Sequence, residues 1–254
     1  MPHSTPKAGT HAVGVIPARY QSSRFPGKPL ALIDGRLLVE RVFERARAAK
    51  RLSRLLVATD DERIAAAVAS FGGEAVMTSP AHATGTDRLA EVARMVVADI
   101  FVNIQGDEPL LDPLDIDRLV DSVDSDSATD FATLVEPLRD PKDAANPNIV
   151  KVVCDAQGRA LYFSRSAIPH VAPGADRFGS GPWLRHVGLY AYRRKFLLEF
   201  ASWKPGVLEE IEGLEQLRAL ERGRTISVVA ARGRYHGVDT PADVRVIEQV
   251  LRTS

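Results

Sequence analysis

Short apolar segments alternate with amphipathic segments along the first half of this chain, and that alternation limits the folds open to it. Residues 12–18 (AVGVIPA), 54–59 (RLLVAT) and 100–105 (IFVNIQ) are apolar runs of strand length. Between the first two, apolar side chains recur at helical spacing over residues 38–50. Strands that alternate with helices favour a mostly parallel sheet covered by helices on both faces. We therefore predict an α/β fold with a mostly parallel, Rossmann-like sheet.

The alternation stops in the middle of the chain. Residues 131–192 contain four strand-like runs with few helical patterns between them, and residues 156–158 (AQG) have the composition of a hairpin turn. Helical patterns return afterwards, one of them over residues 209–221. We predict a single domain over residues 12–254 that carries a β-rich insertion at about residues 131–192. Residues 1–11 are predicted to form a disordered polar tail.

Charge and cysteine content argue against several classes of protein. The 254 residues include 33 Lys and Arg and 33 Asp and Glu, so the formal net charge is zero, whereas general nucleic-acid binders carry a basic excess. A single cysteine, Cys154, cannot form an internal disulfide, which indicates a reducing compartment. No apolar run approaches the roughly 20 residues that span a bilayer. We expect a cytoplasmic protein without a nucleic-acid or membrane partner.

A basic loop follows the first predicted strand. Residues 13–33 contain Arg19, Arg24 and Lys28 and no acidic residue. Ligands of open α/β sheets bind beyond the carboxyl ends of the strands, where this loop would lie. Cations and free backbone amides can cradle a polyphosphate there, although neither a P-loop nor a G-x-G-x-x-G motif is present. The alternative is an ordinary solvated basic loop.

Carboxylates follow two other predicted strands. The segment NIQGDEP places Asp107 and Glu108 directly after a strand, and YHGVDTPAD places Asp239 before the last helix. Magnesium is a hard cation that usually binds through one or two carboxylates and phosphate oxygens. We therefore expect Asp107 and Asp239 to converge on one Mg²⁺. Alternatively, the acidic pair belongs to an ordinary turn and Asp239 only precedes a helix cap.

Nine longer motifs occur in a fixed order along the chain: IPARYQSSRFPGKPL, VATDDERI, TGTDRLAEV, VNIQGDEP, NPNIVKVV, LYFSRSAIP, RHVGLYAY, LEEIEGLEQLR and GVDTPAD. Together they resemble the 3-deoxy-D-manno-octulosonate (KDO) cytidylyltransferases, or CMP-KDO synthetases, over about residues 12–252. The CMP-sialic acid synthetases share the fold, but their first loop is closer to IPAR-x-x-SK. The SSRFPGKPL of this chain favours the KDO family.

The resemblance implies a nucleotidyltransferase that moves CMP from CTP to the 2-hydroxyl of KDO, releases pyrophosphate and forms no covalent enzyme intermediate. Mg²⁺ held by Asp107 and Asp239 would activate the hydroxyl, and a second Mg²⁺ would ride on the triphosphate. We expect Arg19 and Lys28 to act with these carboxylates in catalysis. The nucleotide-binding residues implied by the resemblance are Ala18, Arg19, Ser23, Arg24, Lys28, Thr78, Arg88 and Gln105.

A sugar site is implied as well. Arg165 is the candidate for the KDO carboxylate, with an ordinary ion pair at a strand end as the alternative. His186 and Tyr190 are four residues apart on one strand, so their side chains share a face. Glu212 and Gln216 are four apart on the helix predicted over residues 209–221 and would share a face there. Gln105 completes the implied sugar site.

The resemblance also implies a homodimer formed through the β-rich insertion and a role in lipopolysaccharide precursor synthesis. Two alternatives remain open. The same chemistry could act on another acid sugar, such as sialic acid or 8-amino-KDO. The chain could instead be a catalytically silent CTP-binding protein, but the presence of both Asp107 and Asp239 argues against this.

Overall fold

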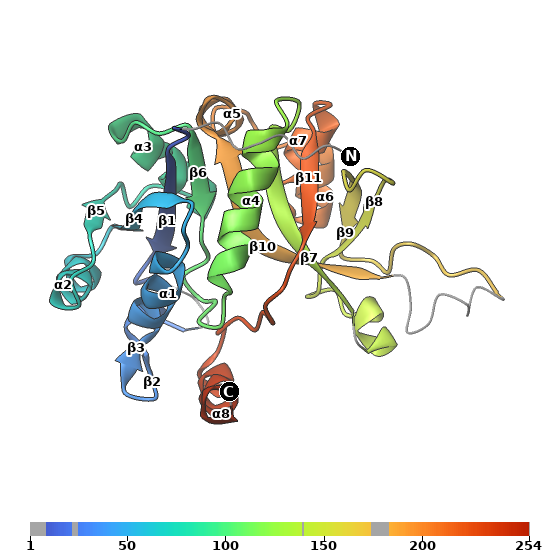
Figure 1. Ribbon diagram of the computed structural model, residues 1–254. Helices are drawn as coiled ribbons and strands as arrows, with labels where there is room; N and C mark the ends of the chain where they lie inside the picture. The colour runs from blue at the N-terminus through green and yellow to red at the C-terminus, as the bar shows by residue number, and fades with distance from the viewer. Residues whose placement is uncertain (1–8, 22–24, 139, 174–182, 254) are drawn as a thin grey trace.

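The computed structural model describes residues 9–21, 25–138, 140–173 and 183–253. A nine-stranded sheet forms its centre, and its main path runs in the order β11-β7-β10-β6-β1-β4-β5 (Figure 1). The strands of this path are β1 (Ala12–Ala18), β4 (Leu52–Thr59), β5 (Ala75–Met77), β6 (Ile100–Asn103), β7 (Phe131–Pro137), β10 (Leu184–Arg193) and β11 (Ile226–Ala230).

Most strands of this path run in one direction. β1 pairs in parallel with β4 and β6, β4 with β5, and β11 with β7. β10 is antiparallel to both of its neighbours on this path, β6 and β7. The prediction of a mostly parallel α/β sheet is therefore confirmed.

The strand-rich middle of the chain extends this sheet. β7 and β10 belong to the main path, and β8 (Lys151–Cys154) and β9 (Ala160–Ser164) form an antiparallel hairpin attached to β10. Gly158 lies in the hairpin turn with φ 74°, a conformation that favours glycine. The predicted turn at residues 156–158 is thus confirmed. A separate two-stranded sheet consists of β2 (Leu32–Ile33) and β3 (Arg36–Leu37).

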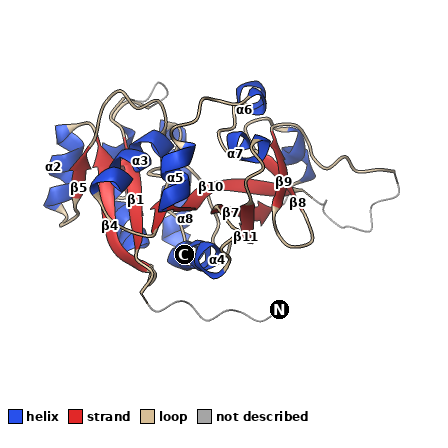
Figure 2. Ribbon diagram, turned by 90° about the horizontal axis from the view of Figure 1, so that it is seen from above, coloured by secondary structure: helices blue, strands red, loops and turns tan. Residues whose placement is uncertain are grey.

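Helices cover both faces of the sheet, and Figure 2 shows α3 and α5 on one side and α4 and α8 on the other. Alternate β1 residues face these two layers: Ile16 packs in the core cluster that includes α1 and α4, and Val15 in the cluster that includes α3 and α5. The α-helices are α1 (Leu38–Arg47), α2 (Glu62–Ser70), α3 (Gly85–Met95), α4 (Pro113–Ser125), α5 (Arg194–Phe200), α6 (Val207–Glu212), α7 (Leu217–Glu221) and α8 (Pro241–Thr253). Two short 3-10 helices are η1 (Lys28–Leu30) and η2 (Pro141–Ala145).

The carboxyl ends of β1 and β6 come together at one edge of the sheet. Gly106 follows β6, and a Cβ at this position would lie 2.9 Å from the backbone oxygen of Pro17 in β1. Glycine therefore permits this close approach. As a result, the loop after β1 and the acidic segment after β6 lie side by side. No helix in the described part of the chain is both long and apolar enough to cross a membrane.

Candidate active site

A cavity of about 410 Å³ opens at the carboxyl ends of β1 and β6. Its walls combine backbone from the strand ends with cations and carboxylates, a composition suited to an anionic ligand and a bound cation. The structure brings six of the sequence-predicted residues together here: Ala18, Arg19, Lys28, Gln105, Asp107 and Asp239. We call this space the first cavity.

Lys28 lies between the two carboxylates that were expected to converge. Its Nζ is 2.7 Å from Oδ2 of Asp107 and 3.5 Å from Oδ1 of Asp239. Lys28 begins η1, and Gly27 before it has φ 72° and donates its N–H to Tyr20 O at 2.8 Å. This turn directs the ammonium group back to the sheet edge. Segments 79 and 211 residues away along the chain thereby meet at one point.

The Asp107–Asp239 pair supplies the carboxylate oxygens that magnesium prefers as ligands. The Lys28 ammonium occupies a position between the carboxylates, so the pair already holds one cation. Among the described residues, no three His, Cys, Asp or Glu side chains are grouped as a metal site. Two carboxylates are nevertheless a usual protein share for Mg²⁺, because phosphate oxygens and water supply the other ligands.

Arg19 is the other predicted phosphate-binding cation that lines the first cavity. Arg19 donates from Nη1 to Ala83 O at 3.4 Å, which connects the loop after β1 to the loop before α3. Ser23 and Arg24 lie outside the described residues.

Thr78 and Arg88 contact each other and do not appear in the walls of this cavity. Arg88 is fully buried, donates from Nη1 to Thr78 Oγ1, and pairs through Nη2 with Asp60 Oδ2 at 3.0 Å. Thr78 in turn donates to Thr59 O at 3.1 Å. These bonds join the end of β4 to α3. The structure therefore shows both residues as buried and paired with each other.

A second cavity, of about 550 Å³, shares Asp107 and Asp239 with the first. Its other walls come from distant parts of the chain: Glu108, the loop of Asn146 and Asn148 after η2, Arg185 and His186 of β10, and His236, Gly237 and Asp243 near α8. A ligand in each cavity could therefore meet the other at the carboxylate pair.

His186 is held neutral where it lines the second cavity. Burial lowers its pKa to about 3, and the charge of Arg185 acts in the same direction. Its Nε2 lies 3.0 Å from Thr133 Oγ1. The His186 ring lies 5.4 Å from that of Tyr190, so the prediction that the two share a face of β10 is confirmed. Gly188 lies between His186 and Tyr190 in the sequence of β10, and the Gln105 side chain packs against it. A Cβ on Gly188 would be 3.7 Å from Gln105 Cγ.

Arg165 and Glu212 are hydrogen-bonded to each other. Neither residue is among those that line the two cavities. The Arg165 guanidinium donates to three backbone oxygens: Pro147 O at 3.0 Å, Glu212 O at 2.8 Å and Gly213 O at 3.3 Å. The Glu212 carboxylate accepts from Ser164 Oγ at 2.6 Å and from Arg165 N at 2.9 Å. In this structure both side chains tie β9 to α6.

The prediction of one continuous helix over residues 209–221 is wrong, because the structure has two shorter helices there. α6 ends at Glu212, Gly213 follows in the left-handed conformation with φ 61°, and α7 begins only at Leu217. The break lets Leu214 enter the core, where it is 6% exposed. Glu212 and Gln216 therefore do not share one helix face as expected.

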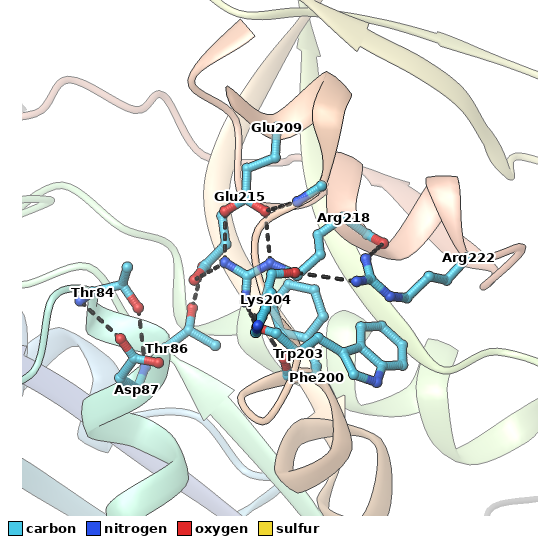
Figure 3. Close-up of polar contacts among 11 residues, drawn as sticks. Thr84, Thr86, Asp87, Phe200, Trp203, Lys204, Glu209, Glu215, Arg218 and Arg222 are labelled. Atoms are coloured by element: carbon cyan, nitrogen blue, oxygen red, sulfur yellow. Dashed lines mark hydrogen bonds and ion pairs between the residues drawn. The ribbon is translucent and has the colours of Figure 1, made fainter. Parts of the chain in front are cut away.

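The break between α6 and α7 instead buries Gln216 and half-buries its neighbour Glu215. Figure 3 shows Glu215 directed at Thr86 in the first turn of α3, and its Oε2 accepts from Thr86 Oγ1. Its Oε1 lies 3.8 Å from Arg218, a cation already bound in a bidentate manner by Glu209. Within the described chain, Glu215 Oε1 and Gln216 Nε2 are buried without a hydrogen-bond partner. Burial accordingly raises the pKa of Glu215.

Several residues of this region were missed by sequence reasoning. Asn103 ends β6 opposite Tyr190, and its Oδ1 is also buried without a hydrogen-bond partner in the described chain. Glu108 was named beside Asp107 in the sequence but was given no role; it lines the second cavity, and burial and then Asp107 raise its pKa to about 8. A polar residue at the end of the apolar run IFVN was a usable signal for Asn103. Glu215 had no comparable signal, because its burial follows from the break at Gly213.

Comparisons with known proteins place this geometry in a family. A cytidylyltransferase family profile matches residues 13–226. The chain is 53% identical over 242 residues to the 3-deoxy-manno-octulosonate cytidylyltransferase of Syntrophobacter fumaroxidans, covering 94% of this chain and 96% of that protein. It is 51% identical over 244 residues to the enzyme of the same name from Myxococcus xanthus, with 94% and 96% covered.

Solved structures agree with these sequence matches. The structure of a CMP:2-keto-3-deoxy-manno-octonic acid synthetase complexed with CTP matches with a TM-score of 0.90 and 43% identity, over 96% of this chain and 99% of that one. The 4-diphosphocytidyl-2C-methyl-D-erythritol synthase of Anaerococcus prevotii, at 13% identity and a TM-score of 0.63, shares the fold. The chain therefore belongs to the cytidylyltransferase family and, within it, to the 3-deoxy-manno-octulosonate cytidylyltransferases.

Proposed function

We propose that this protein transfers CMP from CTP to the 2-hydroxyl of KDO and releases pyrophosphate. The names of the relatives and the CTP complex of the similar synthetase support both substrates. The observation that carries the proposal in this chain is that two polar cavities share Asp107 and Asp239. A reaction between two anionic substrates requires such a meeting point.

The first cavity suits the triphosphate of CTP. Arg19 and Lys28 line it and carry charges that complement phosphate oxygens. The sugar oxygen would attack the α-phosphorus, and the bond to the leaving pyrophosphate would break. Arg19 and Lys28 would then stabilise the charge that develops on the pyrophosphate.

The second cavity and the adjoining face of β10 suit the sugar acid. We define the β10 polar face as His186 and Tyr190 of β10 together with Glu215 and Gln216, which lie between α6 and α7. His186 lines the second cavity and contacts the Tyr190 ring, and burial, followed by the charge of Glu215, raises the pKa of Tyr190. Glu215 Oε1 and Gln216 Nε2, which have no hydrogen-bond partner among the described residues, would offer an acceptor and a donor for sugar hydroxyls.

Asp107 and Asp239 would hold a magnesium ion in this scheme. The two carboxylates and the ammonium between them support that assignment. When bound, the ion would lower the pKa of the sugar hydroxyl and neutralise phosphate charge. Lys28 would exchange its carboxylate partners for phosphate oxygens of CTP.

The test is pyrophosphate release from purified protein supplied with Mg²⁺, one nucleotide and one sugar acid. CTP with KDO should release pyrophosphate, whereas UTP with KDO and CTP with sialic acid should not. Release with sialic acid or 8-amino-KDO in place of KDO would keep the chemistry and change the sugar. Binding of CTP without release from any sugar would contradict the proposal.

We also expect this chain to form a homodimer through the strand-rich residues 131–192. Light scattering would test this, because a dimer has twice the 27.7 kDa mass of the chain. A single species at 27.7 kDa would contradict it.

A further inference from the structure

Asp239 is carried by a stretch of chain with no regular structure. The link of residues 231–240 runs from the end of β11 to the start of α8 without helix or strand. The Asp239 side chain is half exposed, so packing around the carboxylate does little to fix it. Its position relative to Asp107 therefore depends on contacts that hold the backbone of the link, besides the ion pair with Lys28.

Asp115 provides the strongest of these contacts. It lies in the first turn of α4 and is fully buried. Its carboxylate accepts from the N–H of Arg232 at 2.9 Å, from the N–H of Gly233 at 3.1 Å and from Tyr235 Oη at 3.0 Å. One buried side chain thus satisfies three donors of the link.

Arg118, one turn later on α4, holds the other side of the same bend. Its Nη1 donates to Ala230 O, the last carbonyl of β11, and lies 3.6 Å from Asp115 Oδ1. α4 therefore places a cation at the carbonyl where β11 ends and a carboxylate at the amides that follow. Gly233 also packs closely, because a Cβ there would lie 3.0 Å from Asp112 Cβ.

The far end of the link rests on the acidic segment after β6. Val238 donates its N–H to Asp107 O at 2.9 Å. A Cβ on Gly237 would lie 3.3 Å from Glu108 Oε1, so the two segments touch. Asp243 of α8 accepts from Asp239 N at 2.9 Å and from Thr240 N at 2.7 Å. The link is held at both ends, and Asp115 is the anchor on the β11 side.

We propose that Asp115 is a positioning residue for Asp239. Through the link, Asp115 sets the separation between the Asp239 and Asp107 carboxylates. This role rests on the proposed function, in which that pair holds a divalent cation. An amide at position 115 keeps the shape of the side chain but replaces one of its two acceptor oxygens with an NH2 group, which would face the Arg232 N–H in either orientation. The link would then lose an acceptor and shift, although no residue that touches substrate has changed.

The test compares Asp115→Asn with Asp117→Asn. Asp117 lies on the same helix and is also buried, but it accepts from the N–H of Arg51 at 2.7 Å, a residue outside the link. The readout is Mn²⁺ binding, followed by electron paramagnetic resonance in the presence of CTP and without sugar. Asp239→Asn gives the reference signal for loss of the carboxylate site.

We expect Asp115→Asn to weaken Mn²⁺ binding at the Asp239-dependent site by roughly 10–100-fold, the usual effect of removing a partner behind a metal ligand. Asp117→Asn should lower the unfolding temperature without this change. Tyr235→Phe, which removes one of the three donors and leaves the carboxylate, should weaken binding by a smaller factor. It also keeps the test decisive if Asp115→Asn fails to fold.

Equal Mn²⁺ binding in Asp115→Asn and Asp117→Asn, or unchanged binding in Tyr235→Phe with Asp115→Asn unfolded, would overturn the positioning role. Failure of the proposed metal assignment would give a different result. If Asp239→Asn binds Mn²⁺ as tightly as the unchanged protein, the carboxylate pair is not the metal site, and the proposed function loses its cation assignment.

Discussion

The two cavities that meet at Asp107 and Asp239 are built in different ways. Much of the first consists of residues at the ends of β1 and β6, two neighbouring parallel strands. The second gathers the loop after η2, the antiparallel strand β10 and the link to α8. Parallel strands bring their carboxyl ends to one edge by construction, whereas the second cavity depends on contacts between distant segments. Strand patterns in the sequence therefore predict which residues meet in the first cavity, but they do not predict this for the second.

Asp107→Ala tests the point where both cavities meet and should have the largest effect. Substitution of a residue that supports a metal ligand usually lowers metal affinity or activity about 10–100-fold. Loss of a ligand itself should therefore lower kcat by more than about 100-fold. The unfolding temperature should change little, because the side chain is partly exposed and lies at the sheet edge. Steady-state kinetics and thermal unfolding check both parts. Normal turnover would remove Asp107 from the reaction.

A pair of matched substitutions, Glu215→Gln and Glu212→Gln, would sharpen the contrast on the sugar side. Glu215 has a buried oxygen, Oε1, that accepts no hydrogen bond from the described residues, so its loss should raise the KM for KDO about tenfold and leave the KM for CTP unchanged. Glu212 already accepts from Ser164 and Arg165. Its substitution should cost about 1–3 kcal/mol of stability with little change in either KM.

Denaturant unfolding and substrate titrations separate these outcomes. The opposite pattern, with the KDO defect in Glu212→Gln, would restore the assignment expected from the sequence and remove Glu215 from the β10 polar face.

Tyr190→Phe removes one hydroxyl from the β10 polar face and should have a moderate effect. Loss of a neutral hydrogen bond of about 1 kcal/mol corresponds to roughly a fivefold rise in the KM for KDO. The KM for CTP should stay near its original value, because Tyr190 is not among the residues that line the first cavity. If the KM for CTP rises instead, Tyr190 belongs to the nucleotide side.

The last prediction concerns stability and pH, not substrate affinity. His186 has a folded-state pKa of about 3, below the 6.5 of an exposed histidine. Between these values the unfolded chain binds a proton that the folded chain does not, so stability falls as the pH decreases from 6.5 toward 3. The slope from one such group is at most about 1.4 kcal/mol per pH unit.

Unfolding curves between pH 7 and pH 4 would measure this slope in the unchanged protein and in His186→Asn. The slope should be shallower in His186→Asn. Identical slopes in the two proteins would mean that His186 is protonated as easily in the folded state as in the unfolded one.

Residues at parallel strand ends were predictable from the sequence because local patterns decide their place. The apolar runs before Arg19 and Asp107 identify buried strands, and the topology then brings Lys28, Asp107 and Asp239 to one edge. The even spacing of His186 and Tyr190 placed them on one face of β10 for the same reason.

Side chains whose roles depend on distant partners were not predictable. Arg88 is at the start of α3, but the position of Asp60 in space decides that its guanidinium is buried in an ion pair. Helical periodicity continued through residues 209–221, yet Gly213 in the left-handed conformation ended the helix and Leu214 entered the core. That break separated Glu212 from Gln216 and turned Glu215 inward.

The most direct test of the central claim is a crystal structure with CTP, Mg²⁺ and a KDO analogue that lacks the attacking 2-hydroxyl. We expect the triphosphate in the first cavity against Arg19 and Lys28, and the sugar acid in the second cavity against His186. The metal ion should lie between them on Asp107 and Asp239. A sugar bound away from His186, or a metal ion that contacts neither carboxylate, would contradict the account.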